Sequence, residues 1–102
     1  MLNRITLAVL AAGSLGLAGT AQAAGDAAAG QAKAASCGMC HGPQGQGTQM
    51  GPKLAGEDSA KFIQAMNDYK SGKLDNAMMK AQAASLSDED IANLAAYYAS
   101  LK

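Results

Sequence analysis

Aromatic residues, cysteine and histidine are scarce in this chain of 102 residues. It has no tryptophan, one phenylalanine and three tyrosines, and only two cysteines and one histidine. A structural zinc site takes four Cys or His ligands, so this chain has too few for one. Basic and acidic residues number eight each, which argues against nucleic acid as a partner because a nucleic-acid-binding domain carries a basic excess. No segment alternates convincingly with a period of two, and the pattern therefore predicts no strand.

The first 23 residues have the three parts of a secretory signal peptide. Arg4 supplies the positive n-region, an apolar run extends from Ile5 to Leu17, and residues 21–23 form an A-x-A cleavage site. A membrane anchor is the alternative, but the run is interrupted by glycines and falls short of the roughly 20 apolar residues that span a bilayer. We therefore expect cleavage after Ala23 and a periplasmic product, residues 24–102. No second hydrophobic segment follows, so we expect no membrane insertion after cleavage.

Both cysteines and the histidine lie together in residues 37–41, C-G-M-C-H. C-x-x-C followed directly by His is the attachment signature of a c-type haem. Cys37 and Cys40 can each add across one of the two vinyl groups on the porphyrin edge, and His41 can bind the iron from below the ring. The motif therefore predicts one haem c, covalently held through Cys37 and Cys40, with His41 as the proximal iron ligand.

A redox-active dithiol and a plain disulfide are the other interpretations of the two cysteines. A thioredoxin-like dithiol needs a strand before the motif and a βαβ unit around it. The flanks here are instead rich in alanine on one side and in glycine on the other. A haem also suits the size of the chain, because residues 24–102 make one marginal domain in which a covalently bound porphyrin would supply the apolar bulk that the few aromatic residues do not.

Helical signals begin soon after the expected cleavage site. Asp26 can cap a first helix from Ala27 to about Ser36, a segment rich in alanine and lysine. Glycines and both prolines then break any regular pattern as far as Gly56. This predicts a long loop, containing the C-G-M-C-H motif, that wraps around the bound group.

Two further helices are predicted in the second half of the chain. One opens at residues 57–59 and stops at Gly72, with apolar residues at helical spacing (Phe62, Ile63, Met66, Tyr69). The other starts at the capping-box-like run 87–90, and its apolar face comprises Ile91, Leu94, Ala95, Tyr98 and Leu101. The connection between them, from Gly72 to Ser87, is expected to be poorly helical. The fold class predicted from these patterns is all-α.

The second axial position of the iron is either filled by a side chain or open to small molecules. No other histidine exists, so a methionine thioether is the available ligand. Met39 lies inside the attachment motif and cannot reach over the ring. Met66 lies in the apolar stripe of the second helix, where packing is its expected role, and Met50 follows the motif closely. Met78 and Met79, in the later connection, are the best candidates.

Six pieces, in a fixed order, cover nearly all of residues 24–102: GDAAAG at 25–30, CGMCHG at 37–42, GPKLAG at 51–56, YKSG at 69–72, MM at 78–79 and LSDEDIANLAAYY at 86–98. In these pieces the chain resembles a small class I bacterial cytochrome c, closest to the c-four and c-five type periplasmic cytochromes. The resemblance implies a class I cytochrome c fold, with three to four helices wrapped around one covalent haem. Many relatives carry two such haem domains, whereas this sequence has one attachment site.

The resemblance also assigns roles to single residues. It implies that Met79, rather than its neighbour, is the axial ligand, because relatives place this methionine about seven residues before the Leu-Ser of the last helix. It implies that the second N–H of His41 donates to the backbone carbonyl of Pro52, and that Leu54 and Leu94 pack on the haem. Relatives also pass a glycine of the first helix against an aromatic residue of the last. Gly30 and Tyr97 occupy those positions.

By this resemblance the protein is expected to be a soluble one-electron carrier of a bacterial respiratory chain and not an enzyme. Its expected partners are redox proteins: membrane cytochrome complexes, a terminal oxidase or a periplasmic reductase. Four lysines near the expected pocket either rim a docking face or are ordinary solvated side chains (Lys53, Lys70, Lys73, Lys80). A haem enzyme or gas-binding protein with an open sixth position is the alternative, although nothing in the sequence indicates a distal His, Arg or acid for it.

Overall fold

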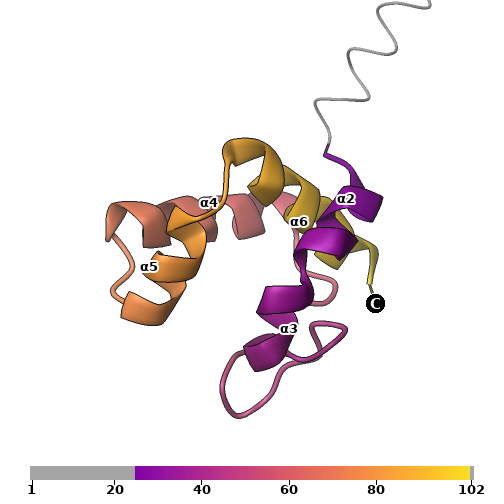
Figure 1. Ribbon diagram of the computed structural model, residues 1–102, viewed down its shortest axis with the longest axis horizontal. Coiled ribbons are helices and arrows are strands. Elements are labelled where there is room, and N and C mark those ends of the chain that lie inside the picture. The colour runs from indigo at the N-terminus through magenta and orange to yellow at the C-terminus, as the bar shows by residue number, and fades with distance from the viewer. Residues whose placement is uncertain (1–24, 102) are drawn as a thin grey trace, which may run out of the picture.

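The computed structural model describes residues 25–101, and this range contains helices but no strand (Figure 1). The helices are α2 (Ala27–Lys33), α3 (Ala35–His41), α4 (Ser59–Ser71), α5 (Ala77–Ala84) and α6 (Asp88–Ser100). The all-α prediction is confirmed. No helix in residues 25–101 has the length and apolar character needed to cross a membrane. The predicted signal peptide, residues 1–23, lies outside the described residues.

The chain is more helical than the sequence patterns predict. The C-G-M-C-H motif, expected in a loop, forms the last five of the seven residues of α3. Ala34, between α2 and α3, keeps a right-handed helical conformation, so the chain runs on with helical geometry into the motif. The loop starts only at Gly42, whose positive φ of 97° ends α3. The first predicted helix is thus two consecutive helices.

The connection between Gly72 and Ser87 contains α5, so the prediction of a poorly helical segment there is wrong. Asn76 caps this helix, because its side-chain oxygen accepts a hydrogen bond from the backbone N–H of Met79 at 3.0 Å. The eight residues of α5 are alanine, methionine, lysine and glutamine, all of them good helix formers. With α5 and the division of the first helix, the described range has five helices instead of three to four.

Helices α2 and α6 cross closely, and Gly30 makes this crossing possible (Figure 1). A Cβ atom at Gly30 would meet the carbonyl oxygen of Asn93 and would lie 2.9 Å from the Cβ of Tyr97. Gly30 is buried, and nothing larger fits there without separating the helices. The predicted contact of Gly30 with Tyr97 is confirmed. Asn93 adds a second link, since its side-chain oxygen accepts from the backbone N–H of Asp26 at 2.7 Å.

The core lies where α4 packs against α5 and against α6, with Ala34 of the α2–α3 junction joining it. Its buried members are Ala34, Phe62, Met66, Ala83, Ile91, Leu94, Ala95 and Tyr98. The apolar faces predicted for the two later helices supply most of them, while Ile63, Tyr69 and Leu101 are only partly buried. Phe62 and Tyr98 pack with ring centroids 5.8 Å apart, which joins α4 to α6.

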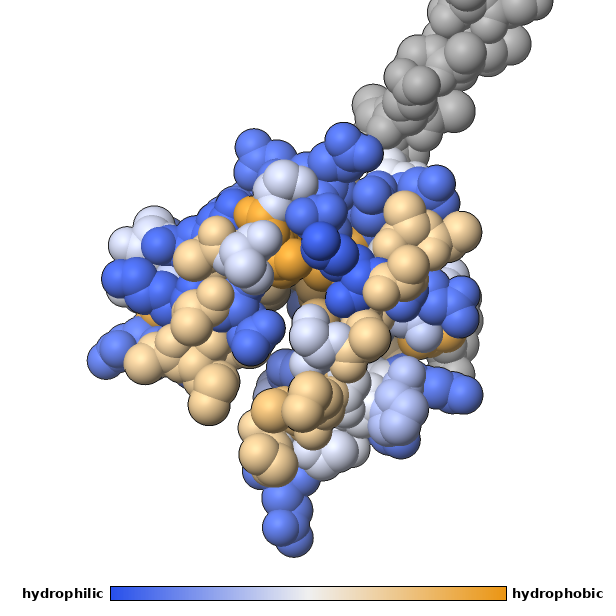
Figure 2. Space-filling model, in the orientation of Figure 1, coloured by the Kyte–Doolittle hydropathy of each residue, from blue (hydrophilic) through white to orange (hydrophobic). Residues whose placement is uncertain are grey.

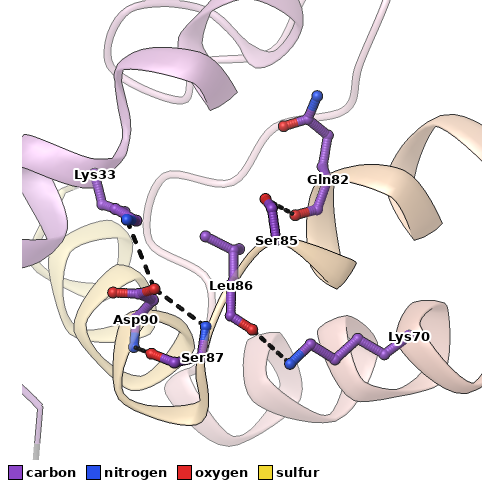
Figure 3. A network of polar contacts seen from close by, with 7 residues as sticks. All are labelled: Lys33, Lys70, Gln82, Ser85, Leu86, Ser87 and Asp90. Atoms are coloured by element: carbon purple, nitrogen blue, oxygen red, sulfur yellow. Dashed lines mark hydrogen bonds and ion pairs between the residues drawn. The ribbon is translucent and has the colours of Figure 1, made fainter.

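The capping box at the start of α6 is formed as predicted (Figure 3). The Ser87 hydroxyl oxygen accepts from the Asp90 backbone N–H at 3.0 Å, and an Asp90 carboxylate oxygen accepts from the Ser87 N–H at 3.1 Å. Lys33 lies 3.7 Å from the same carboxylate. The Ser87 backbone hydrogen bond, aided by Lys33, lowers the pKa of Asp90. The stabilisation that Asp90 contributes is therefore present at neutral pH and lost as the pH falls through this lowered pKa.

Replacing Ser87 with alanine should destabilise the protein by about 1 kcal/mol, because the N-cap hydrogen bond to Asp90 is lost. The measurement is the free energy of unfolding in urea. Ser100→Ala is the control, since Ser100 is exposed at the other end of α6 and its hydroxyl only donates to the nearby Tyr97 carbonyl. It should change stability by less than about 0.5 kcal/mol. Equal effects of the two changes would contradict a special role for the cap.

Candidate functional site

A cavity of about 320 Å³ lies between α5 on one side and α3 with the loop after it on the other. Figure 2 shows the hollow between these two parts of the molecule, with apolar surface on both walls. Three residues of the attachment motif line it (Cys37, Cys40, His41), as does the predicted axial methionine, Met79. Apolar side chains of α4 complete this part of the lining (Phe62, Met66, Tyr69). The structure thus brings together residues that are far apart in the sequence.

The helical state of the motif places its three reactive residues on one face of α3. Positions i, i+3 and i+4 of an α-helix are neighbours on its surface, and Cys37, Cys40 and His41 have this spacing. Both cysteines are free and partly buried. The two thiols and the imidazole therefore lie on the same wall of the cavity, and helical geometry alone places them there.

Cys37 does not have the character of a redox-active thiol. Burial raises the pKa of its thiol above the usual value, and hydrogen bonding to Tyr98 offsets this only in part. Reactive cysteines instead have a lowered pKa, because the thiolate is the attacking species. This observation argues against the interpretation of Cys37 and Cys40 as a thioredoxin-like pair.

His41 is held in a single orientation at the end of α3. It is 7% exposed, and its Nδ1 lies 2.7 Å from the backbone carbonyl oxygen of Pro52. A carbonyl oxygen can only accept a hydrogen bond, so Nδ1 carries the hydrogen atom and its N–H donates a hydrogen bond to the Pro52 carbonyl. The lone pair of the neutral ring is then on Nε2, which is the atom left to bind a metal. The contact between His41 and Pro52 expected from the family resemblance is present.

Gly51 is a site residue that the sequence analysis did not single out. A Cβ atom at this position would lie 2.9 Å from both Cε1 and Nδ1 of His41, and 3.0 Å from the carbonyl oxygen of Cys40. Glycine thus allows the loop to pass directly against the imidazole and to present the Pro52 carbonyl. Thr48 keeps the loop folded there, since its hydroxyl donates to the Cys40 carbonyl and its N–H donates to Gly51 at 2.8 Å. The G-P dipeptide was the only signal in the sequence.

The methionines differ greatly in exposure. Met39, Met50 and Met78 are 81%, 76% and 64% exposed, whereas Met79 is partly buried against the core. Met79 and Ala83 are one helical turn apart, and they are the only residues of α5 that are not exposed. The inner face of α5 therefore carries Met79 into the cavity wall opposite the motif. Met78, although it also lines the cavity, is mostly solvated.

Other predicted site residues take different places. Leu54 lines the cavity, but Leu94 does not: it is fully buried in the core. Glu57, which the sequence analysis did not consider, lines the cavity and is partly buried. Of the four lysines that were expected near the pocket, three are exposed (Lys53, Lys73, Lys80). Lys70 is partly buried, and its Nζ donates to the backbone carbonyl of Leu86 at 2.6 Å.

The cavity residues fit a haem c. One wall has two free thiols at the C-x-x-C spacing and an imidazole whose Nε2 is free to coordinate iron. The opposite wall has a thioether, and the lining between them is mainly apolar, as a porphyrin requires. In residues 25–101 no group of three or more His, Cys, Asp or Glu side chains forms a site for a metal ion alone.

Comparison with known proteins gives a consistent result. Residues 23–97 match the family described as Cytochrome C oxidase, cbb3-type, subunit III. The chain is 47% identical over 102 residues to cytochrome c4 of Pseudomonas aeruginosa, covering 99% of this chain and 50% of the relative. It is 44% identical over 91 residues to cytochrome c-554(547) of Halothiobacillus neapolitanus, covering 78% of this chain and 100% of the relative.

The fold shows the same similarity. The crystal structure of reduced recombinant cytochrome c4 from Pseudomonas stutzeri matches with a TM-score of 0.70 at 37% identity, covering 78% of this chain and 47% of that one. The present chain spans about half the length of the cytochromes c4 that it matches.

Proposed function

The chain belongs to the class I bacterial cytochromes c, with their covalent haem c, and from this membership we propose that it is a one-electron carrier of a bacterial respiratory chain. The observation that carries the proposal is the cavity, because two thiols, an imidazole and a thioether line this one mainly apolar space. The bound haem supplies an iron that changes by one electron. The protein supplies the ligands and excludes water.

The roles of the ligands follow from their surroundings. Cys37 and Cys40 anchor the porphyrin by thioether bonds, and His41 is the proximal ligand. The hydrogen bond to Pro52 makes the imidazole a stronger ligand and holds its plane. Met79 is the second axial ligand. Thioether ligation and an apolar pocket both favour the reduced state, and so raise the reduction potential compared with two imidazoles.

The same surroundings favour electron transfer over haem enzymology. The only histidine is His41 and the only arginine is Arg4, in the predicted signal peptide. Neither is available on the Met79 side of the cavity to act as a general acid on a bound peroxide. Glu57 is the one acid in the lining, and in the chain it lies between Leu54 and the start of α4, not in α5, which carries Met79. We infer that the protein is not an enzyme.

The proposed location is the periplasm. Cleavage after Ala23 would leave residues 24–102, and no helix in residues 25–101 has both the length and the apolar character to cross a membrane. The proposed partners are redox proteins such as membrane cytochrome complexes, a terminal oxidase or a periplasmic reductase. Exposed Lys53, in the cavity lining, would steer such partners toward the opening, together with the exposed Lys80 of α5 and Lys73 between α4 and α5. Leu94 is not included in the proposed haem contacts because it does not reach the cavity.

The test is the mass and the visible spectrum of the exported protein. We expect the mass of residues 24–102 plus one haem that denaturation does not remove. Sharp low-spin bands should be present in both oxidation states, and CO should leave the reduced spectrum unchanged. The mass of the bare polypeptide would refute the proposal. Bands that shift with CO would instead favour the alternative of an open sixth position.

A further inference from the structure

The helix that carries Met79 is held in place by few contacts. Of its eight residues only Ala83 is buried, and Met79 is partly buried. Within the described range α5 packs against α4 and against no other helix. A helix of this length is not stable by itself in water. The position of the Met79 thioether therefore depends on the contacts that fasten the two ends of α5.

The N-terminal end of α5 is held by hydrogen bonds to its own N-cap residue. The side-chain oxygen of Asn76 accepts from the Met79 N–H, and the backbone carbonyl of Asn76 accepts from the Lys80 N–H at 2.8 Å. These bonds fix the backbone of the first turn, which includes Met79 itself. They do not fix the helix as a body against the rest of the protein.

The other end is fastened from α4 by Lys70 (Figure 3). Its ammonium group donates to the carbonyl of Leu86, two residues beyond the end of α5, at 2.6 Å in a partly buried position. A charged donor makes a stronger hydrogen bond than a neutral one. The last turn of α5 has no basic residue of its own, so Lys70 also brings a positive charge near the C-terminal end of the helix, where the helix dipole is negative.

We propose that Lys70 is a positioning residue for the second axial ligand: by clamping the Leu86 carbonyl it holds α5 against α4 and so keeps Met79 on the iron. This inference rests on the proposed function, in which Met79 is that ligand. It gives Lys70 a role different from the three exposed lysines, because its amino group is engaged inside the structure. Loss of the Lys70–Leu86 hydrogen bond lets α5 move away from α4 more often. The iron position that Met79 occupies is then open for a larger fraction of the time.

The expected effect can be measured with imidazole, which competes with Met79 in the oxidised protein. The apparent dissociation constant of such a competitor is its intrinsic value divided by the fraction of open molecules. Lys70→Leu removes the donor and its charge but keeps an apolar stem and the helix propensity. Because a hydrogen bond from a charged donor is lost, imidazole should bind about tenfold more tightly to this variant.

Matched variants separate positioning from general effects. Lys61→Leu makes the same change at an exposed position of the same helix and should bind imidazole as the wild type does. Lys70→Arg keeps a charged donor and should restore most of the wild-type affinity. Lys70→Gln, which removes the charge and brings the donor nitrogen one atom closer to the backbone, serves if Lys70→Leu does not fold, and should also tighten imidazole binding. If Lys70 had only a structural role, its replacement by leucine would lower the free energy of unfolding in urea and leave the affinity for imidazole unchanged.

The outcomes distinguish this inference from the proposed function. If the wild type shows the thioether-to-iron band and Met79→Ala removes it, but Lys70→Leu binds imidazole within twofold of wild type, the positioning role is wrong and the carrier proposal stands. Equal tightening by Lys61→Leu would likewise overturn it, by showing an unspecific charge effect. A wild type that lacks the band overturns the proposed ligand and this inference together.

Discussion

Met79→Ala is expected to abolish the thioether-to-iron absorption band completely and to let the reduced protein bind CO. Met79 is the only methionine on the inner face of α5, one turn from the buried Ala83 and opposite the wall that carries His41. Alanine has no atom that can coordinate iron. The reduction potential should fall, because the thioether ligand that favours the reduced state is lost. Spectra of the oxidised and reduced protein, with and without CO, measure the change.

Met78→Ala is the matched control for this prediction. Met78 is the adjacent residue on the same helix, but its side chain is 64% exposed. Its removal should leave the band, the CO response and the potential close to those of wild type. If Met78→Ala alone abolishes the band, the ligand assignment is wrong, while the function as an electron carrier is unaffected.

Gly30→Ala should destabilise the protein by about 3 kcal/mol or more. The new Cβ would overlap the carbonyl oxygen of Asn93 and would lie 2.9 Å from the Cβ of Tyr97, so α2 and α6 must separate. Alanine favours a helix by up to about 1 kcal/mol over glycine, but overpacking of this kind typically costs about 1–3 kcal/mol and sometimes more. The backbone oxygen cannot rotate away, so the clash should dominate. Unfolding in urea measures the difference.

Gly38→Ala makes the same substitution where there is room. Gly38 lies in α3, and a Cβ there would have its nearest neighbour, Pro43 Cα, at 3.5 Å, an ordinary van der Waals contact. This variant should be neutral or more stable by up to about 1 kcal/mol, since only the helix propensity changes. A Gly30→Ala protein as stable as Gly38→Ala would show that the α2–α6 crossing tolerates a side chain.

Local chemistry made several elements predictable from the sequence. Asp26, Asp58 and Ser87 cap the helices that follow them, and Gly72 ends α4 in the left-handed conformation. Each of these signals acts within one helical turn, so neighbouring residues suffice to recognise it. Two predictions failed: glycine was given too much weight around the attachment motif, and the run of helix formers after Asn76 was given too little. Gly38 does not interrupt α3, and Gly72 and Ser87 bound a segment that contains a helix.

Contacts between distant segments were not predictable from local patterns. Lys70 looked like its three exposed neighbours in the sequence, yet its amino group reaches a carbonyl 16 residues further along the chain. In the sequence Gly51 has no feature that sets it apart from other loop glycines. The structure shows that glycine is needed there because the His41 ring lies against its backbone. The family resemblance implied a haem contact for Leu94, and the structure places this residue fully buried in the core.

The sequence by itself determined the cofactor and the family, because the chemistry of attachment needs two thiols and an imidazole at a spacing that is read directly from the chain. Only the tertiary structure decided how the second wall of the cavity is built: that it is a helix, α5, with Met79 on its inner face, and that Lys70 contacts the segment that follows this helix. The physical reason is that attachment depends on covalent neighbours, whereas the second wall depends on the packing of α4, α5 and α6, where small differences in helix rotation change which side chains are buried.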